Sequence, residues 1–119
     1  MLKLSRTSLQ WLAKSTLFIL ALIPLCSNAG MTPEEVKHFQ ETKVLAEKGD
    51  SNAQDDLGFC YYNGLGVAKD DIEAYAYLNL AGITNERARK KLAELEAKLT
   101  PDARLKGQQR TKELQKEIH

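Results

Sequence analysis

The sequence is poor in the side chains that usually hold metals or carry out nucleophilic chemistry. Its 119 residues include two cysteines and two histidines. Cys26 lies in an N-terminal segment that we expect to be removed, which leaves Cys60 without a partner inside the chain. A single cysteine excludes an intrachain disulfide and a thiolate zinc site. Because Cys60 stands beside Leu57 and Tyr61 on a predicted helix, we interpret it as a buried, inert thiol; pairing between two chains is the alternative.

The sequence also lacks an apolar run long enough to span a membrane. The run over residues 17–25 falls short of the roughly 20 residues that a spanning helix needs. A basic segment without acids precedes it and small residues follow at 27–29, which together indicate a signal peptide over residues 1–29, cleaved after Ala29. This predicts a periplasmic or secreted protein. A retained membrane anchor is one alternative. Lipidation of Cys26 is another, and the bulky Leu25 before it argues against it.

No motif in the chain indicates catalysis or a cofactor. Residues 50–55 resemble a calcium loop, but Asp55 stands where that loop requires glycine. Residues 64–66 follow a predicted helix and lack the Gly-Lys-Ser/Thr ending of a phosphate-binding loop. No serine or cysteine is placed with a histidine and an acid in a triad pattern. We therefore expect no enzyme activity, no cofactor and no metal. An exported protein without interleaved basic and aromatic residues is also not expected to bind nucleic acid.

Charge is divided unevenly along the expected mature chain. Residues 30–83 carry four basic and ten acidic side chains, whereas residues 84–119 carry ten basic and six acidic ones. Such a dipolar molecule can orient a charged partner or associate head to tail. The densest basic cluster is Arg87 with residues 89–91. It could meet an acidic partner, but we interpret it as a solvated helix face.

Helix start and stop signals dominate the chain from Thr32 onward. Thr32, followed by Pro33 and Glu35, predicts a capped helix start, and Gly49 predicts the end of this first helix. Further helix starts are predicted at Asp50, at Asp70 or Asp71, at residues 84–85 and at residues 100–102. Strand-like alternation of useful length does not occur. The pattern predicts an all-α domain of five helices joined by short loops.

An internal repeat is visible within this order of helices. Ala53 and Leu57 recur as Ala88 and Leu92, displaced by 35 residues, and a period of this size indicates stacked helical hairpins. Small and apolar residues at helical spacing form the expected packing surface of one hairpin, and glycines shape its loop. This structural set is Ala53, Leu57, Gly58, Tyr61, Gly64, Gly66, Ala74, Tyr77 and Ala81. We expect Leu57, Tyr61 and Tyr77 to interlock in the core.

In this order, the same residues resemble a Sel-one-like repeat, a relative of the tetratricopeptide repeats. The resemblance covers a full repeat at about 46–82 and a half repeat at 85–99, with a C-terminal helix at 101–117. Tyr77 stands where the family often has tryptophan. Residues 81–85 are one residue short of the family pattern and lack the glycine expected before the next helix.

The resemblance implies both a fold and a function. The fold is a short α-hairpin solenoid of about one and a half repeats with flanking helices, over residues 30–119. The implied function is that of an adaptor in protein assemblies. Cysteine-rich relatives of this repeat family have been linked to β-lactam binding or hydrolysis, so a hydrolase is an alternative. Those relatives carry paired cysteines, whereas Cys60 has no partner.

Several side chains lie off the predicted packing lines and are the candidate partner-binding residues. They are Asp55, Asp56, Phe59, Tyr62, Asn63 and Tyr75. Exposed aromatic rings beside carboxylates would form a mixed apolar and acidic patch, and aromatic anchors are frequent in binding hot spots. The alternative is that Phe59 and Tyr62 pack against the first helix or against the helix of Leu92.

The sequence therefore predicts an exported helical-repeat scaffold that binds an unidentified protein or peptide. Self-association is a second option, because repeat arrays usually need about three or more units to be stable alone. A membrane-tethered accessory factor is the remaining alternative, which requires that the N-terminal segment is retained.

Overall fold

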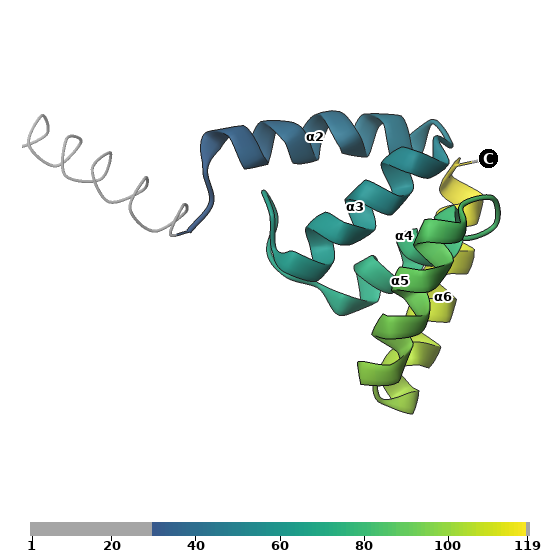
Figure 1. Ribbon diagram of the computed structural model, residues 1–119. Helices are drawn as coiled ribbons and strands as arrows, with labels where there is room; N and C mark the ends of the chain where they lie inside the picture. The colour runs from purple at the N-terminus through teal and green to yellow at the C-terminus, as the bar shows by residue number, and fades with distance from the viewer. Residues whose placement is uncertain (1–29, 119) are drawn as a thin grey trace, which may run out of the picture. The chain divides into compact units, whose positions relative to one another are not determined.

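The computed structural model describes residues 30–118, and these form five α-helices and no strand (Figure 1). The helices are α2 (Pro33–Glu47), α3 (Ser51–Asn63), α4 (Asp71–Ala81), α5 (Glu86–Lys98) and α6 (Pro101–Ile118). The predicted all-α class is confirmed. The predicted signal peptide, with Cys26, lies outside the described residues. Within residues 30–118, no helix combines the length and the apolar character needed to cross a membrane.

The helix starts follow the capping residues that the sequence predicts. At α2, the backbone N–H of Glu35 donates to the Thr32 hydroxyl at 3.1 Å, and the Thr32 N–H donates to the Glu35 carboxylate at 2.9 Å, which completes a capping box. Helices α3 and α4 are capped by Asp50 and Asp70, whose carboxylates accept from N–H groups of the first turn. Asn85 caps α5 in the same way. These bonds are local, so the sequence alone determines where each helix begins.

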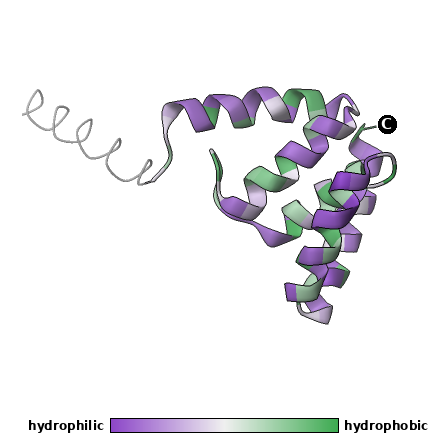
Figure 2. Ribbon diagram, in the orientation of Figure 1, coloured by the Kyte–Doolittle hydropathy of each residue, from purple (hydrophilic) through white to green (hydrophobic). Residues whose placement is uncertain are grey.

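Helix α4 is the central element of the stack. It packs against α3, α5 and α6, while α2 packs against α3. Seven of the eleven residues of α4 are buried, because neighbours cover nearly its whole circumference. The outer helices are instead hydrophilic over much of their length (Figure 2). The core has two clusters, and α4 contributes to both of them.

The first cluster contains the interlocked side chains that the sequence predicts. Leu57 is fully buried, and the Tyr77 ring stacks on Tyr61 with ring centroids 5.9 Å apart and planes 8° apart. Phe39 of α2 meets Tyr61 edge to face at 5.4 Å. Burial raises the pKa of the Tyr77 hydroxyl. This aromatic column joins α2, α3 and α4 in one core, and it confirms the predicted interlocking.

Two glycines allow the backbone to approach its neighbours closely. A Cβ on Gly58 would lie 2.8 Å from Leu78 Cγ, so the missing side chain lets α3 pack tightly on α4. Gly66 has a φ of 71°, and a Cβ there would run into the carbonyl oxygen of Glu35. The loop over residues 64–70 therefore passes directly against the first turn of α2.

Candidate functional site

Asp55 is buried between α3 and α5, where two cations hold it. The residue is 0% exposed, and its carboxylate accepts hydrogen bonds from Arg87 Nε at 2.6 Å and from Lys91 Nζ at 3.0 and 3.1 Å. A carboxylate removed from water needs such partners because its desolvation is costly. The interpretation of Asp55 as part of an exposed acidic patch is therefore wrong. The interpretation of the basic cluster as a solvated face is confirmed for Arg87, which stays 60% exposed, and Arg87 and Lys91 also bind Asp55 from that face.

Tyr75 is also covered, in this case by α6. The residue is 2% exposed, and its hydroxyl donates to Glu96 Oε1 at 3.0 Å. A Cβ on Gly107 would lie 2.5 Å from the Tyr75 ring, so α6 crosses the ring at its glycine. Burial raises the pKa of Tyr75. The prediction that Tyr75 is an exposed aromatic is wrong, because the C-terminal helix docks on α4 despite its polar composition.

The other four candidate residues are not buried. Asp56 is exposed and lies 3.7 Å from a terminal nitrogen of the Arg87 guanidinium. The exposed Asn63 side chain donates to the backbone carbonyl of Phe59 at 3.0 Å. Phe59 is 46% exposed, and Tyr62 is half-buried. The partner-binding role of these four residues stays a prediction, and the two rings mark the place where it can be examined.

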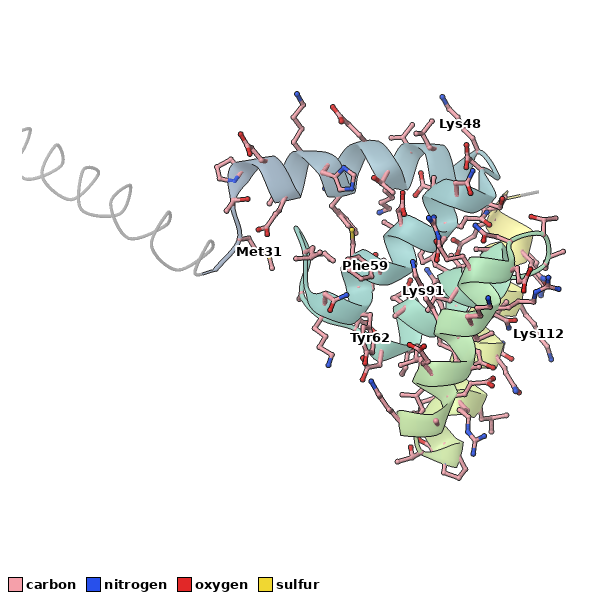
Figure 3. The ribbon with its side chains drawn as sticks, viewed as in Figure 1. Met31, Lys48, Phe59, Tyr62, Lys91 and Lys112 are labelled. Atoms are coloured by element: carbon pink, nitrogen blue, oxygen red, sulfur yellow. The ribbon has the colours of Figure 1, made fainter. Side chains whose placement is uncertain are left out.

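Phe59 and Tyr62 stand on one side of a groove between α3 and α5, with a volume of about 230 Å³. The lining residues are Phe59 and Tyr62 from α3, Leu78 from α4, and Lys91, Glu94, Leu95 and Lys98 from α5. Leu78 and Leu95 are buried and supply an apolar lining. Figure 3 shows Phe59 and Tyr62 on α3 with Lys91 on the neighbouring α5. The groove is thus apolar inside, with charged side chains from one helix only.

Lysine ammonium groups stand over both aromatic rings of the groove. Lys91 Nζ lies 5.3 Å from the Phe59 ring centroid, and Lys98 Nζ lies 5.4 Å from that of Tyr62. Lys98 Nζ also donates a hydrogen bond to the Tyr62 hydroxyl at 2.7 Å, and this bond raises the pKa of Lys98. Lys69, from the loop before α4, approaches the Tyr62 ring at 5.3 Å. These contacts place three positive charges around two partly exposed aromatic side chains.

The alternative that Phe59 and Tyr62 pack against the helix of Leu92 identified α5 as their neighbour, but the sequence analysis missed the lysines that α5 places there. The repeat period contains the signal. Contacts across α3 and α5 join residues 36 apart, as in Asp55–Lys91 and Tyr62–Lys98. The period of 35 residues that relates Leu57 to Leu92 therefore also identifies which turn of α5 faces each turn of α3. An offset of 36, one residue more than the repeat period, pairs Asp55 with Lys91 and Tyr62 with Lys98.

The described residues offer little for cofactor or thiol chemistry. Residues 30–118 contain no group of three or more histidine, cysteine, aspartate or glutamate side chains that could hold a metal ion. Cys60 is free and buried, and burial raises its pKa, with a smaller contribution from the negative charge of Asp56. What this arrangement can do is bind, through apolar contact inside the groove and through the lysine charges at its aromatic side.

Comparison with known proteins agrees with this description of the fold. Neither protein-family models nor curated proteins give a significant match to the chain. One similar solved structure is the crystal structure of a protective antigen present in uropathogenic Escherichia coli strains, which displays an SLR fold. The two superpose with a TM-score of 0.68 at 28% sequence identity, over 71% of this chain and 18% of that one. This chain therefore spans less than a fifth of that protein's length.

The stacked helices and the superposition define a helical-repeat protein of the tetratricopeptide-like class. Within that class the chain has the SLR, or Sel-one-like repeat, fold of the similar structure. The resemblance seen in the sequence is confirmed at this level. The division into a full repeat at 46–82 and a half repeat at 85–99 stays a prediction.

Proposed function

We propose that the chain is an exported scaffold that binds a segment of another protein in the groove between α3 and α5, and that it catalyses no reaction. The single observation that carries the proposal is Phe59, a phenylalanine that is 46% exposed beside the buried Leu78 and Leu95. A partly exposed aromatic ring next to a ready apolar lining is typical of a binding hot spot.

The size of the groove supports a protein side chain as its occupant. Pockets for cofactors and drug-sized ligands usually have volumes of roughly 300–1,000 Å³. The groove, at about 230 Å³, is below that range and suits one large side chain with part of its neighbour. A scaffold that engages partners through single anchoring side chains matches this shape.

Site-specific photo-cross-linking in the native host tests the proposed function. A benzoylphenylalanine in place of Phe59 is expected to give a discrete covalent adduct with a partner protein. The matched control carries the same group in place of Leu105, which is 64% exposed on α6. Adducts of equal yield at both positions, or none at position 59, would contradict a partner in the groove.

Export rests on the residues of the N-terminal segment, and a mass measurement tests it. The intact mass of protein recovered from the periplasmic or secreted fraction is expected to correspond to a chain that begins at Gly30. Recovery of a chain that retains residues 1–29 in the membrane fraction would favour the membrane-tethered alternative instead.

A further inference from the structure

The aromatic side of the groove concentrates positive charge around Tyr62. The ammonium groups of Lys69 and Lys98 lie 5.3 and 5.4 Å from the centroid of that ring. Two like charges gathered on one ring repel each other unless an anion lies nearby. The anion available to Lys69 is Asp71 at 3.9 Å, in a pair whose members are 60% and 40% exposed, and such pairs are weak.

Lys98 is the cation with capacity left for a ligand. Its Nζ donates one hydrogen bond, to the Tyr62 hydroxyl, and among residues 30–118 it forms no ion pair within 4.0 Å. Lys91 differs, because the fully buried Asp55 already holds its ammonium group. An ammonium group has three donors, so Lys98 can keep its bond to Tyr62 and still bind a carboxylate.

Glu94 restricts where that carboxylate can lie. Glu94 also lines the groove, one helical turn before Lys98, and its charge repels an incoming anion. The favourable position is therefore at the Lys98 end, close to Tyr62 and Lys69, with the apolar lining of Phe59 and Leu95 beside it. One anchored apolar side chain and one neighbouring carboxylate fit this division of the groove.

We propose that the groove recognises a protein segment in which a large apolar side chain stands next to an aspartate or glutamate. The apolar side chain lies between Phe59 and Leu95, and the carboxylate binds Lys98 with Lys69 close by. This inference rests on the proposed function and names the chemistry of the partner. A protein segment fits better than an anionic lipid surface, because the lysines flank a narrow groove that contains Glu94 and not an open basic face.

Selection from a library of random peptides displayed on phage tests the inference directly. The immobilised full chain is expected to enrich peptides in which an aromatic or large aliphatic residue adjoins an acidic one. The Lys98→Gln variant is expected still to enrich peptides with a large apolar residue, but no longer to favour an acidic residue next to it. The Phe59→Ala variant is expected to enrich neither. Lys90→Gln is the matched control, because Lys90 loses the same charge from the same helix but lies outside the groove lining.

Affinities of a selected peptide then measure the effect. Lys98→Gln is expected to weaken the binding of an acidic peptide about fivefold or more. Binding of the same peptide with glutamine in place of its acidic residue is expected to be unchanged, and added salt is expected to reduce the difference between the two peptides. An equal loss with Lys90→Gln would overturn the inference, since it would indicate charge attraction without a site. Enrichment of neutral or basic peptides, or of none, would overturn it as well.

Two further outcomes separate this inference from its alternatives. Binding to vesicles of phosphatidylglycerol and phosphatidylethanolamine that Lys98→Gln abolishes, without peptide enrichment, would assign the lysines to a membrane surface and overturn the inference. A cross-linked partner at position 59 that lacks an acidic residue beside its contact would overturn the inference while leaving the proposed function in place.

Discussion

Helix α3 contacts α4 and α5 in opposite ways. Toward α4 it presents Leu57 and Gly58, and the two helices meet through a tight apolar interface. Toward α5 it presents the buried Asp55, held by two cations, and beside this ion pair the groove remains open. The comparison indicates that the first contact supplies most of the stability of the hairpin, while the second sets the position of α5 and leaves side chains available for a partner.

The largest effect is expected from breaking the α3–α4 contact. Leu57→Ala removes a fully buried side chain and leaves a cavity, which should lower the free energy of unfolding by about 2–5 kcal/mol. Chemical denaturation measures this change. Val44→Ala is the control, because Val44 is 50% exposed and its loss should change stability by less than about 0.5 kcal/mol. An unchanged denaturation midpoint for Leu57→Ala would contradict the core assignment.

A smaller effect is expected from breaking the α3–α5 contact. Asp55→Asn removes the charge that Arg87 and Lys91 share, at an expected cost of about 1–3 kcal/mol in unfolding free energy. The cost stays below the roughly 3–5 kcal/mol of a fully buried pair, because the Arg87 and Lys91 side chains are 60% and 31% exposed and remain solvated. Asp56→Asn, at a 54% exposed side chain, is the matched control and should change little.

Asp55→Asn is also expected to change the groove beside it, through Lys91. With Asp55 neutral, the hold on Lys91 weakens, and the resonances of the Phe59 ring should shift in a nuclear magnetic resonance spectrum. The stacked pair of Tyr61 and Tyr77 should not change, because it belongs to the α3–α4 contact. Equal changes in both regions would mean that the two contacts are not separable.

The smallest effect at neutral pH is expected from Tyr77→Phe, which becomes visible only under alkaline conditions. Burial raises the pKa of Tyr77 above its ordinary value of 10.0. Above pH 10 the unfolded chain therefore loses the phenol proton while the folded chain keeps it. The contribution of Tyr77 to the free energy of unfolding is fully present below this pH, and it falls as the pH rises toward the folded-state pKa. Unfolding free energies at pH 8 and at about pH 11 should show a smaller alkaline loss for Tyr77→Phe than for the parent chain.

How far the sequence predicts this molecule depends on the range of each interaction. The capping residues Thr32, Asp50 and Asn85 act within their own first turns, so the helix boundaries follow from local pattern. The burial of Leu57 and Tyr77 follows from helical spacing.

The candidate site was only partly predictable, because it depends on which helices dock side by side. Asp55 and Tyr75 appear exposed when α3 and α4 are considered as one hairpin, and they are buried once α5 and α6 are added. Phe59 and Tyr62 could be identified from one helix. The lysines over these rings, Lys91 and Lys98, come from α5, which lies 32 and 36 residues further along the chain. In the sequence, only the repeat period connects the two helices.

The central place of α4 has a consequence for biosynthesis. The Tyr75 ring is covered by α6 at Gly107. The core around Tyr77 includes Leu114, which is almost fully buried near the end of α6. During translation, α4 therefore leaves the ribosome before α5 and α6, the two later helices that cover it. Its apolar surface is exposed to solvent until they are made. Chains whose translation stops before α6 should aggregate or be degraded, even though they contain all of the groove residues.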